Sequence, residues 1–238
     1  MPPLLQAREP INKILASNPE IQGYDDATYV FTDISYGLSN RARKIVARDP
    51  DGVLREASWE EREKMCQIYF PAPGKKLDMP KMFLDNHFKD CILRGDYEFI
   101  LDRACAQFEP DDPEYIRVTR TTYDSIDERR AYGIIQSTRH FGPMVLHLVL
   151  SKKMDDLMFY FISENDLNAG ADLVRLFRTV ESISSNVDLT NDSQLVEDYI
   201  KKHSLKKPIL ELAWETYLEI ERQRTTINSP GNQQQISN

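Results

Sequence analysis

The sequence predicts an α+β protein that is predominantly α-helical, with a small N-terminal antiparallel β-meander followed by a helical body. β-branched and aromatic residues around a turn signal precede Ser58, and segments with apolar residues at helical spacing fill most of the remainder. The 238 residues are 41% hydrophobic, which is enough apolar material for a core. We divide the chain into an extended arm (1–26), a β-meander plus helices (27–110), a helical body (111–224) and a disordered tail (225–238).

The arm contains four prolines and no strong periodicity, and we expect it to be extended, with one short helix near residues 11–17. Arg8 and Lys13 are offset by two glutamates, and no secretory apolar segment follows them. We therefore expect no presequence in the first twenty residues.

A compact hairpin is predicted after a first strand at residues 29–36. Residues 41–48 and 53–57 pair through the turn Asp49-Pro50-Asp51-Gly52. Pro50 presets φ for the second turn position, and Gly52 can adopt a positive φ on leaving the turn.

Ser58 and Glu61 have capping-box spacing, so a helix is predicted to start at Trp59 and to stop before Pro71. We expect Met65, Ile68 and Tyr69 to form its apolar face and to pack on the sheet. Further helices are predicted at residues 80–93, 97–108, 123–138, 143–150, 155–163, 166–183, 193–203 and 208–224.

The sequence holds no recognisable catalytic or cofactor motif: GxGxxG, GxxxxGK[ST] and GxSxG are all missing. His87 and Cys91 lie four residues apart on a predicted helix, but nothing nearby supplies a second pair of metal ligands. We expect no enzyme, no cofactor and no metal. An enzyme assembled from distant residues stays open as an alternative, which a concave pocket with converging titratable groups would reveal. No apolar run reaches the length of a bilayer span, so we expect no membrane insertion.

The formal net charge of −8 is concentrated in residues 154–199, where ten acidic residues face only Arg175 and Arg178. Outside this segment the charges sum to about zero. We expect the acidic segment to face solvent or a protein partner, and any phosphate contact to come from local basic patches.

Two basic patches are candidates for RNA binding. The first lies on and before one predicted strand, and either contacts phosphates or protects an edge strand against aggregation; both interpretations stay open. The second has acidic neighbours that can pair with it, which favours a solvated face. Neither shows aromatic residues interleaved with the cations in the sequence. The candidate RNA-binding residues are Arg41, Arg43, Lys44 and Arg48 in the first patch and Arg139, Lys152 and Lys153 in the second.

Four blocks carry a resemblance to a known family: YVFTDISY (29–36), ASWEERE (57–63), AQFEPDDPEYIRV (106–118) and STRHFGPMV (137–145). In this order and spacing they resemble the mitochondrion-specific small-ribosomal-subunit protein S-twenty-two family, over residues 1–176.

The resemblance implies a structural constituent of the mitochondrial ribosome in the matrix, which bridges small-subunit ribosomal RNA and neighbouring ribosomal proteins and takes no small-molecule substrate. Family members typically carry a long N-terminal extension with a presequence, and we expect Met1 to align with the family's interior. The alternative is a non-ribosomal helical adaptor that binds proteins through the acidic face of residues 154–199.

Overall fold

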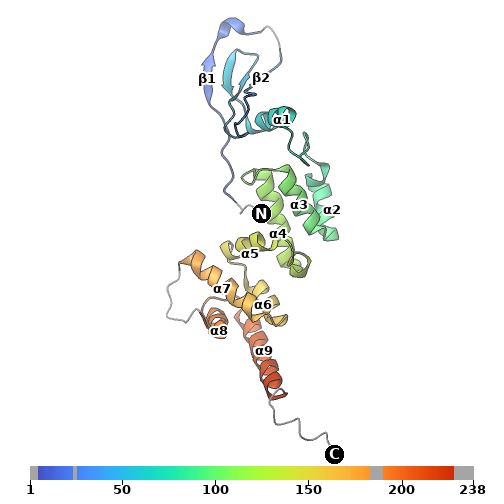
Figure 1. Ribbon diagram of the computed structural model, residues 1–238, viewed down its shortest axis with the longest axis vertical. Helices are drawn as coiled ribbons and strands as arrows, with labels where there is room; N and C mark the ends of the chain where they lie inside the picture. The colour runs from blue at the N-terminus through green and yellow to red at the C-terminus, as the bar shows by residue number, and fades with distance from the viewer. Residues whose placement is uncertain (1–4, 24–25, 183–189, 228–238) are drawn as a thin grey trace, which may run out of the picture. The chain divides into compact units, whose positions relative to one another are not determined.

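A computed structural model describes residues 5–23, 26–182 and 190–227. In these residues, four strands form one sheet near the N-terminus and helices make up most of the chain after it (Figure 1), which confirms the predicted fold class. The chain divides into two compact units. The described residues up to Thr119 form the N-terminal unit, and those from Arg120 onward form the C-terminal unit. The border between them therefore falls inside one helix, α4 (Pro113–Arg129).

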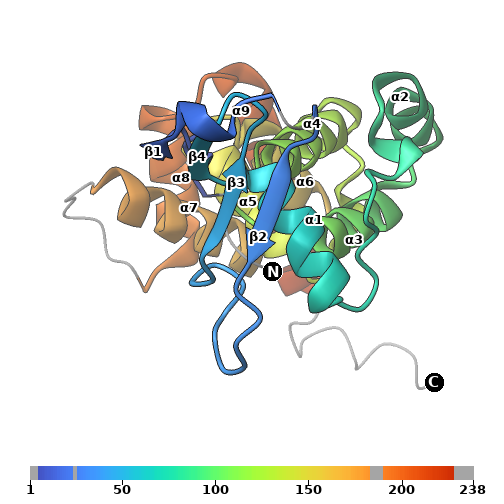
Figure 2. The same ribbon diagram turned by 90° about the horizontal axis from the view of Figure 1, so that it is seen from above.

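The sheet has the strand order β1-β4-β3-β2 (Figure 2), and every neighbouring pair is antiparallel. The strands β2 (Tyr29–Thr32), β3 (Ile45–Arg48) and β4 (Val53–Glu56) form the predicted meander. The prediction of a short helix near residues 11–17 is wrong, because β1 (Ile14–Ser17) pairs with the free edge of β4. All four β1 side chains are exposed, so the segment lacks the alternation that marks a strand in a sequence.

The hairpin turn fixes the end of β1. Gly52 has the positive φ (82°) that the turn signal predicts, and its carbonyl oxygen accepts a hydrogen bond from the Asn18 N–H at 3.0 Å. A Cβ atom at position 52 would lie 2.2 Å from the Asn18 carbonyl oxygen. Only glycine satisfies both the backbone angle and this close approach.

The helix α1 (Trp59–Tyr69) starts with the predicted capping box. The Glu61 N–H donates to Ser58 Oγ (3.3 Å), and the Ser58 N–H donates to Glu61 Oε2 (2.8 Å). Arg55 on β4 donates to both Glu61 and Asp49, which ties the helix start to the hairpin turn. These hydrogen bonds, with Arg55 the largest contributor, lower the pKa of Glu61 to about 2.

The packing face of α1 differs from the expected one. Cys66 and Met65 pack against a buried cluster of Ile45, Ala47 and Ala57 on the sheet side. Ile68 and Tyr69 are instead 58% and 52% exposed. They share a helix face with Met65 by spacing, but the face that meets the sheet is centred near Cys66, about 100° further around the helix.

The rest of the N-terminal unit is helical. After η2 (Lys81–Phe83) come α2 (Asp85–Arg94) and α3 (Tyr97–Gln107). Helical spacing predicts an apolar stripe on α3 made of Tyr97, Ile100, Leu101, Ala104, Cys105 and Phe108. The first four of these side chains are fully buried, and Cys105 and Phe108 are half-buried.

The helix expected at residues 123–138 starts earlier, because α4 begins at Pro113. Pro113 stands at a position where no backbone N–H is needed, and Asp112 Oδ1 accepts from the Glu114 N–H at 2.8 Å. The threonines that favour extended backbone are accommodated, as where Thr119 Oγ1 donates to the Tyr115 carbonyl at 2.7 Å. The helix ends at Arg129, and Arg130 has a positive φ of 53°.

Among the described residues of the C-terminal unit, η3 (Tyr132–Ile134) and five helices follow α4, close to the predicted segments. These are α5 (Phe141–Leu150), α6 (Asp155–Ser163), α7 (Leu167–Glu181), α8 (Asp192–Lys202) and α9 (Lys207–Ile227). Its core includes the fully buried Leu148, Leu157 and Leu195. Of the predicted tail, residues 228–238 lie outside the described residues. Within the described part of the chain, no helix combines the length and apolar character needed to cross a bilayer.

Candidate nucleic-acid interface

A basic cleft of about 530 Å³ lies on the N-terminal unit, at one end of the sheet. Its wall is formed by the arm before β1, the segment leading into β3, the end of β4 and the first turns of α1. The charged residues that line it are Lys13, Arg41, Arg43, Lys44 and Arg62, with Glu56 as the one acid among the lining residues. The hairpin thus gathers three of the predicted RNA-binding residues at one surface.

Lys44 and Arg41 are the exposed cations that the hairpin contributes to this cleft. The Asp33 N–H donates to the Lys44 carbonyl at 3.0 Å, which extends the β2–β3 ladder by one residue. Lys44 therefore alternates with Val46 and Arg48 on the sheet face opposite the buried Ile45. No ion pair among the described residues engages the Lys44 ammonium. Arg41 pairs with Asp111, yet its side chain stays 58% exposed.

Two cations that line the cleft, Lys13 and Arg62, were not predicted from the sequence, because they come from segments distant from the hairpin. Lys13 reaches the cleft through the β1–β4 pairing, in which the Glu56 N–H donates to the Lys13 carbonyl at 2.9 Å. Its ammonium lies 3.2 Å from a Glu56 carboxylate oxygen. Arg62, on the second turn of α1, donates to the carbonyl oxygens of Arg41 (3.2 Å) and Arg43 (2.8 Å). Lys13 could have been placed here from the sequence only by predicting that the arm pairs with β4 as a strand.

Arg43 has a different environment from the other candidates. Its side chain is buried, and its guanidinium donates to the carbonyl oxygens of Asp33 (3.1 Å), Ser35 (2.7 Å) and Leu38 (3.1 Å). The guanidinium carbon lies 3.5 Å from the centroid of the Phe70 ring. Arg43 therefore organises the loop between β2 and β3, and its donors are engaged within the protein.

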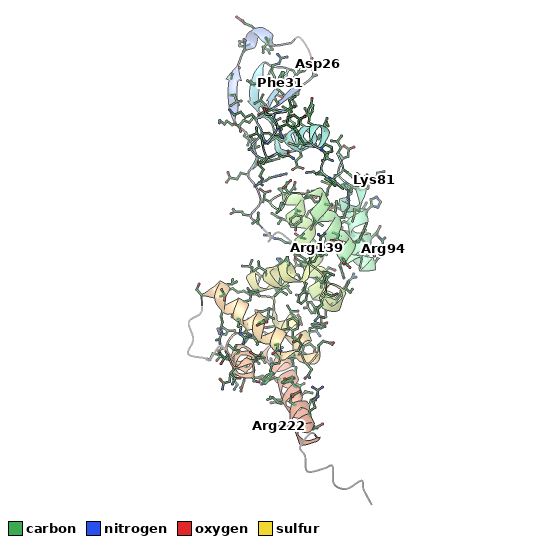
Figure 3. All side chains as sticks on the ribbon, in the orientation of Figure 1. Asp26, Phe31, Lys81, Arg94, Arg139 and Arg222 are labelled. Carbon is green, nitrogen blue, oxygen red and sulfur yellow. The ribbon has the colours of Figure 1, made fainter. Side chains whose placement is uncertain are left out.

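Arg48 lies beside aromatic side chains that strand pairing brings to it. Its guanidinium carbon is 5.2 Å from the centroid of the Tyr29 ring, and Tyr29 is its partner in the β2–β3 register. Phe31, two residues further along β2, is 52% exposed (Figure 3). Along the sequence, aromatic residues and cations do not alternate, but the pairing of β2 with β3 places the aromatic residues of one strand beside the cation of the other. This arrangement suits stacking on unpaired bases.

The second patch belongs to the C-terminal unit, and its lysines are paired. The Lys152 ammonium lies 3.0 Å from Glu181, and the Lys153 ammonium lies 3.1 Å from Asp124. Arg139 is exposed immediately before the residue that caps α5 (Figure 3). The pairing agrees with the solvated-face interpretation for the lysines.

Many acidic side chains of residues 154–199 are engaged within the C-terminal unit. Asp155 accepts hydrogen bonds from the Tyr199 hydroxyl (2.5 Å) and from the backbone N–H groups of Leu205 and Lys206 (2.8 Å each). Arg178 pairs with Asp198 at 2.8 Å, and its side chain is only 5% exposed. These carboxylates join α6, α7, α8 and the start of α9, which leaves less of the acidic segment available to a partner.

The described residues bring together no cluster of three or more His, Cys, Asp or Glu side chains of the kind that could hold a metal ion. His147 lies 3.5 Å from Asp124, and burial lowers the pKa of its imidazole. Burial likewise raises the pKa of the Cys66 thiol, which keeps this cysteine protonated and unreactive.

A basic cleft at the end of a small sheet, with an arginine and aromatic rings beside it, is typical of proteins that bind polyanions. Comparison with known proteins identifies the family. The sequence model of the family described as mitochondrial 28S ribosomal protein S22 matches residues 1–182, and the chain belongs to this family.

Two relatives are both described as small ribosomal subunit protein mS22. The protein of Mus musculus is 38% identical over 225 residues, which cover 92% of this chain and 63% of the relative. The protein of Bos taurus is 37% identical over 224 residues, which cover 92% of this chain and 62% of the relative. The chain thus spans somewhat less than two thirds of the length of these relatives.

Proposed function

We propose that this protein is a structural constituent of the small subunit of the mitochondrial ribosome, works in the matrix, and bridges ribosomal RNA and neighbouring ribosomal proteins. The observation that carries the proposal is the family match over residues 1–182, together with relatives whose names place them in the small ribosomal subunit. The role is one of binding and assembly, with no catalysis and no small-molecule substrate.

The basic cleft is the proposed RNA contact. Arg41 and Lys44 present exposed cations to a concave surface, and Lys13 adds a third that is 68% exposed. Phosphate contacts of this kind fix position without reading sequence, which is what an assembly protein requires. Arg48 with its aromatic neighbours extends the contact along the sheet. Arg139, Lys152 and Lys153 remain proposed as a second contact in the C-terminal unit.

A chain with a net charge of −8 can bind RNA because charge acts locally. The Debye length is about 8 Å at physiological ionic strength, so a phosphate in the cleft is governed by cations nearby and little by carboxylates further away. Asp155 is bound by the Tyr199 hydroxyl and Asp198 by Arg178, both within the C-terminal unit. This argues against the alternative of an adaptor that binds proteins through the acidic face of residues 154–199.

The proposal is tested by sedimentation of the tagged protein from a mitochondrial lysate, with and without RNase. We expect co-migration with the small subunit that collapses after RNase treatment. Migration as a small species that RNase leaves unchanged would contradict the proposal and would return attention to the acidic segment.

The cleft is tested by the double variant Arg41→Gln, Lys44→Glu in the same experiment. We expect reduced incorporation into the subunit and a shallower salt dependence of RNA binding, because up to two phosphate contacts are lost. The matched control is Lys89→Gln, Lys81→Glu, which makes the same charge change at exposed positions outside the lining residues of the cleft. Equal incorporation of the two double variants would remove the cleft from the proposal.

A further inference from the structure

A second concavity on the N-terminal unit has the opposite chemistry to the basic cleft. It measures about 460 Å³ and lies between the arm, α1, the segment before η2 and the connection from α3 to α4. We propose that it binds an extended segment of a neighbouring protein, in which an apolar residue is flanked by lysine or arginine. The apolar lining consists of Pro10, Trp59, Leu77, Met79, Phe108 and Pro113.

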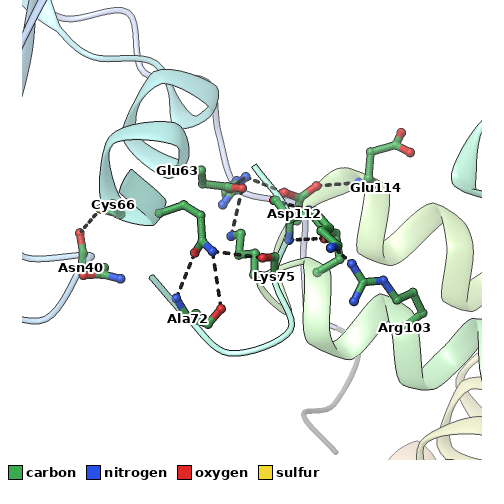
Figure 4. A network of polar contacts seen from close by, with 12 residues as sticks. Asn40, Glu63, Cys66, Ala72, Lys75, Arg103, Asp112 and Glu114 are labelled. Carbon is green, nitrogen blue, oxygen red and sulfur yellow. Dashed lines mark hydrogen bonds and ion pairs between the residues drawn. The ribbon is translucent and has the colours of Figure 1, made fainter. Parts of the chain in front are cut away.

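A polar network holds the pocket in shape. Arg8 contacts Glu63 and lies 2.6 Å from Asp112, and its guanidinium carbon is 4.6 Å from the centroid of the Trp59 ring. Lys75 reaches Glu63 at 3.3 Å, so that the network joins the arm, α1 and the start of α4 (Figure 4). The Arg8 and Asp112 side chains are only 9% and 11% exposed, so this ion pair stabilises the fold and is not available to a ligand. A site that is already formed loses less entropy when a ligand binds.

The aromatic wall is also fixed. Trp59 Nε1 donates to the Glu9 carbonyl at 2.7 Å, and the Phe83 ring packs against Phe108 with centroids 5.0 Å apart. Leu77 and Met79, which line the same pocket, are 49% and 43% exposed. Exposed apolar side chains in a pocket with a fixed aromatic wall form a surface that gains free energy when another apolar side chain covers it.

The charges of the lining favour a cationic ligand. Five carboxylates line the pocket against two cations, Arg8 and Lys64. The carboxylates are Glu60, Glu63, Asp78, Asp112 and Glu114. Four of the five pair within the protein: Glu63 and Asp112 with Arg8, Glu60 with Lys64, and Glu114 with Arg117. The acids that the rim presents to a ligand are therefore Asp78, which is exposed, and Glu60, whose side chain stays 78% exposed. An RNA backbone would be repelled here, whereas lysine or arginine on either side of a buried apolar residue would be attracted.

The identity of the occupant as a neighbouring ribosomal protein rests on the proposed function, since proteins that coat RNA are rich in basic segments. The preference for a cation-flanked apolar residue rests on the pocket alone. The two ideas therefore fail separately: the sedimentation experiment tests the first, and a peptide titration tests the second.

The peptide titration uses the full chain with Trp214→Phe, which leaves Trp59 as its single tryptophan. The probe is a short fluorescein-labelled peptide with leucine and proline at its centre and two lysines at each end. We expect saturable anisotropy together with a change in Trp59 emission. A peptide with glutamates in place of the lysines, and one with serine in place of the leucine, should each bind at least tenfold more weakly.

Two variants assign the binding to the pocket. Leu77→Ser with Met79→Ser removes exposed apolar contacts, and Asp78→Lys with Glu60→Lys reverses the rim charge; each should weaken the lysine peptide about tenfold or more. The matched controls are Leu93→Ser with Phe99→Ser, and Asp90→Lys with Glu98→Lys, which alter exposed side chains on α2 and α3 outside the pocket lining. All these positions are exposed, so the variants are expected to fold, and a thermal melt of each verifies it.

Three results would overturn the proposal: no saturable binding of the lysine peptide, equal binding of the glutamate peptide, or unchanged binding by both pocket variants. Binding of a short unstructured RNA that Asp78→Lys strengthens and that Leu77→Ser with Met79→Ser weakens would assign the surface to nucleic acid instead; the Trp59 response alone does not separate the two sites, because Trp59 also lines the basic cleft.

Discussion

Single residues in the hairpin segregate into surface charge and structural charge, and the sequence does not distinguish them. Arg43 and Lys44 are neighbours, yet one is buried against three carbonyl oxygens and an aromatic ring while the other is exposed in the cleft. Because side chains alternate along a strand, Arg43 and Lys44 point to opposite faces of the sheet. The sequence pattern does not show that the carbonyl oxygens of the loop between β2 and β3 accept hydrogen bonds from Arg43, because this depends on the conformation of the loop.

This difference gives a prediction at the residue scale. Arg43→Gln should lower the free energy of unfolding by about 2–4 kcal/mol, because it removes a buried guanidinium that donates to three carbonyl oxygens and packs on the Phe70 ring. Lys44→Gln is the matched control and should change stability by less than about 0.5 kcal/mol. Urea unfolding followed by circular dichroism measures both. Equal stability of the two variants would mean that Arg43 is dispensable to the loop and open to RNA.

Among the elements, those set by local signals were predictable from the sequence. The capping box at Ser58, the turn at Gly52 and the stripe of α3 each rest on a few neighbouring residues, and each has the predicted form. In contrast, β1 exists because β4 offers it a free edge. The start of α4 depended on Asp112 and Pro113 outweighing a run of β-branched residues, which propensity alone misjudges.

The candidate site was predictable only in part, for the same reason. The hairpin sequence located Arg41, Lys44 and Arg48, because cations close along a strand stay close in space. Lys13 and Arg62 enter the cleft through strand pairing and helix packing. The acidic-rimmed pocket draws on segments about one hundred residues apart, from Arg8 to Asp112, and left no local pattern to find.

The contact between the hairpin turn and β1 supplies a prediction at the element scale. Gly52→Ala should destabilise the protein by about 2–4 kcal/mol, since it combines a positive φ with a Cβ atom 2.2 Å from the Asn18 carbonyl oxygen. Gly37→Ala is the control: its φ of 83° is similar, but nothing lies within 4 Å of the added Cβ. It should cost only about 1 kcal/mol.

Hydrogen exchange separates the two glycine variants structurally. In Gly52→Ala the amides of β1 (Ile14–Ser17) should lose protection, because the Asn18 carbonyl must move and the strand that precedes it moves with it. In Gly37→Ala they should keep it. Equal costs and equal protection would show that the turn and the strand are not mechanically coupled.

For the whole molecule, the net charge does not show how differently the two units use their charged residues. The N-terminal unit carries both a basic cleft and an acidic-rimmed pocket, whereas many of the charges of residues 154–199 pair within the C-terminal unit. A single net charge of −8 therefore describes neither surface. If both proposals hold, RNA and protein partners meet the N-terminal unit at separate sites, and the helical C-terminal unit contributes its own fold through internal ion pairs.

The division into two units predicts how the chain unfolds. Leu157 is fully buried in α6, so Leu157→Ala should lower the stability of the C-terminal unit by about 2–5 kcal/mol. Because each unit is compact by itself, hydrogen exchange of the full-length variant should speed up in α6 to α9, while the amides of β3 and β4 keep their protection. The border lies inside α4, where protection should fall from its first half to its second. Equal loss of protection in the sheet and in α6 would instead show that the continuous helix α4 couples the two units into one cooperative fold.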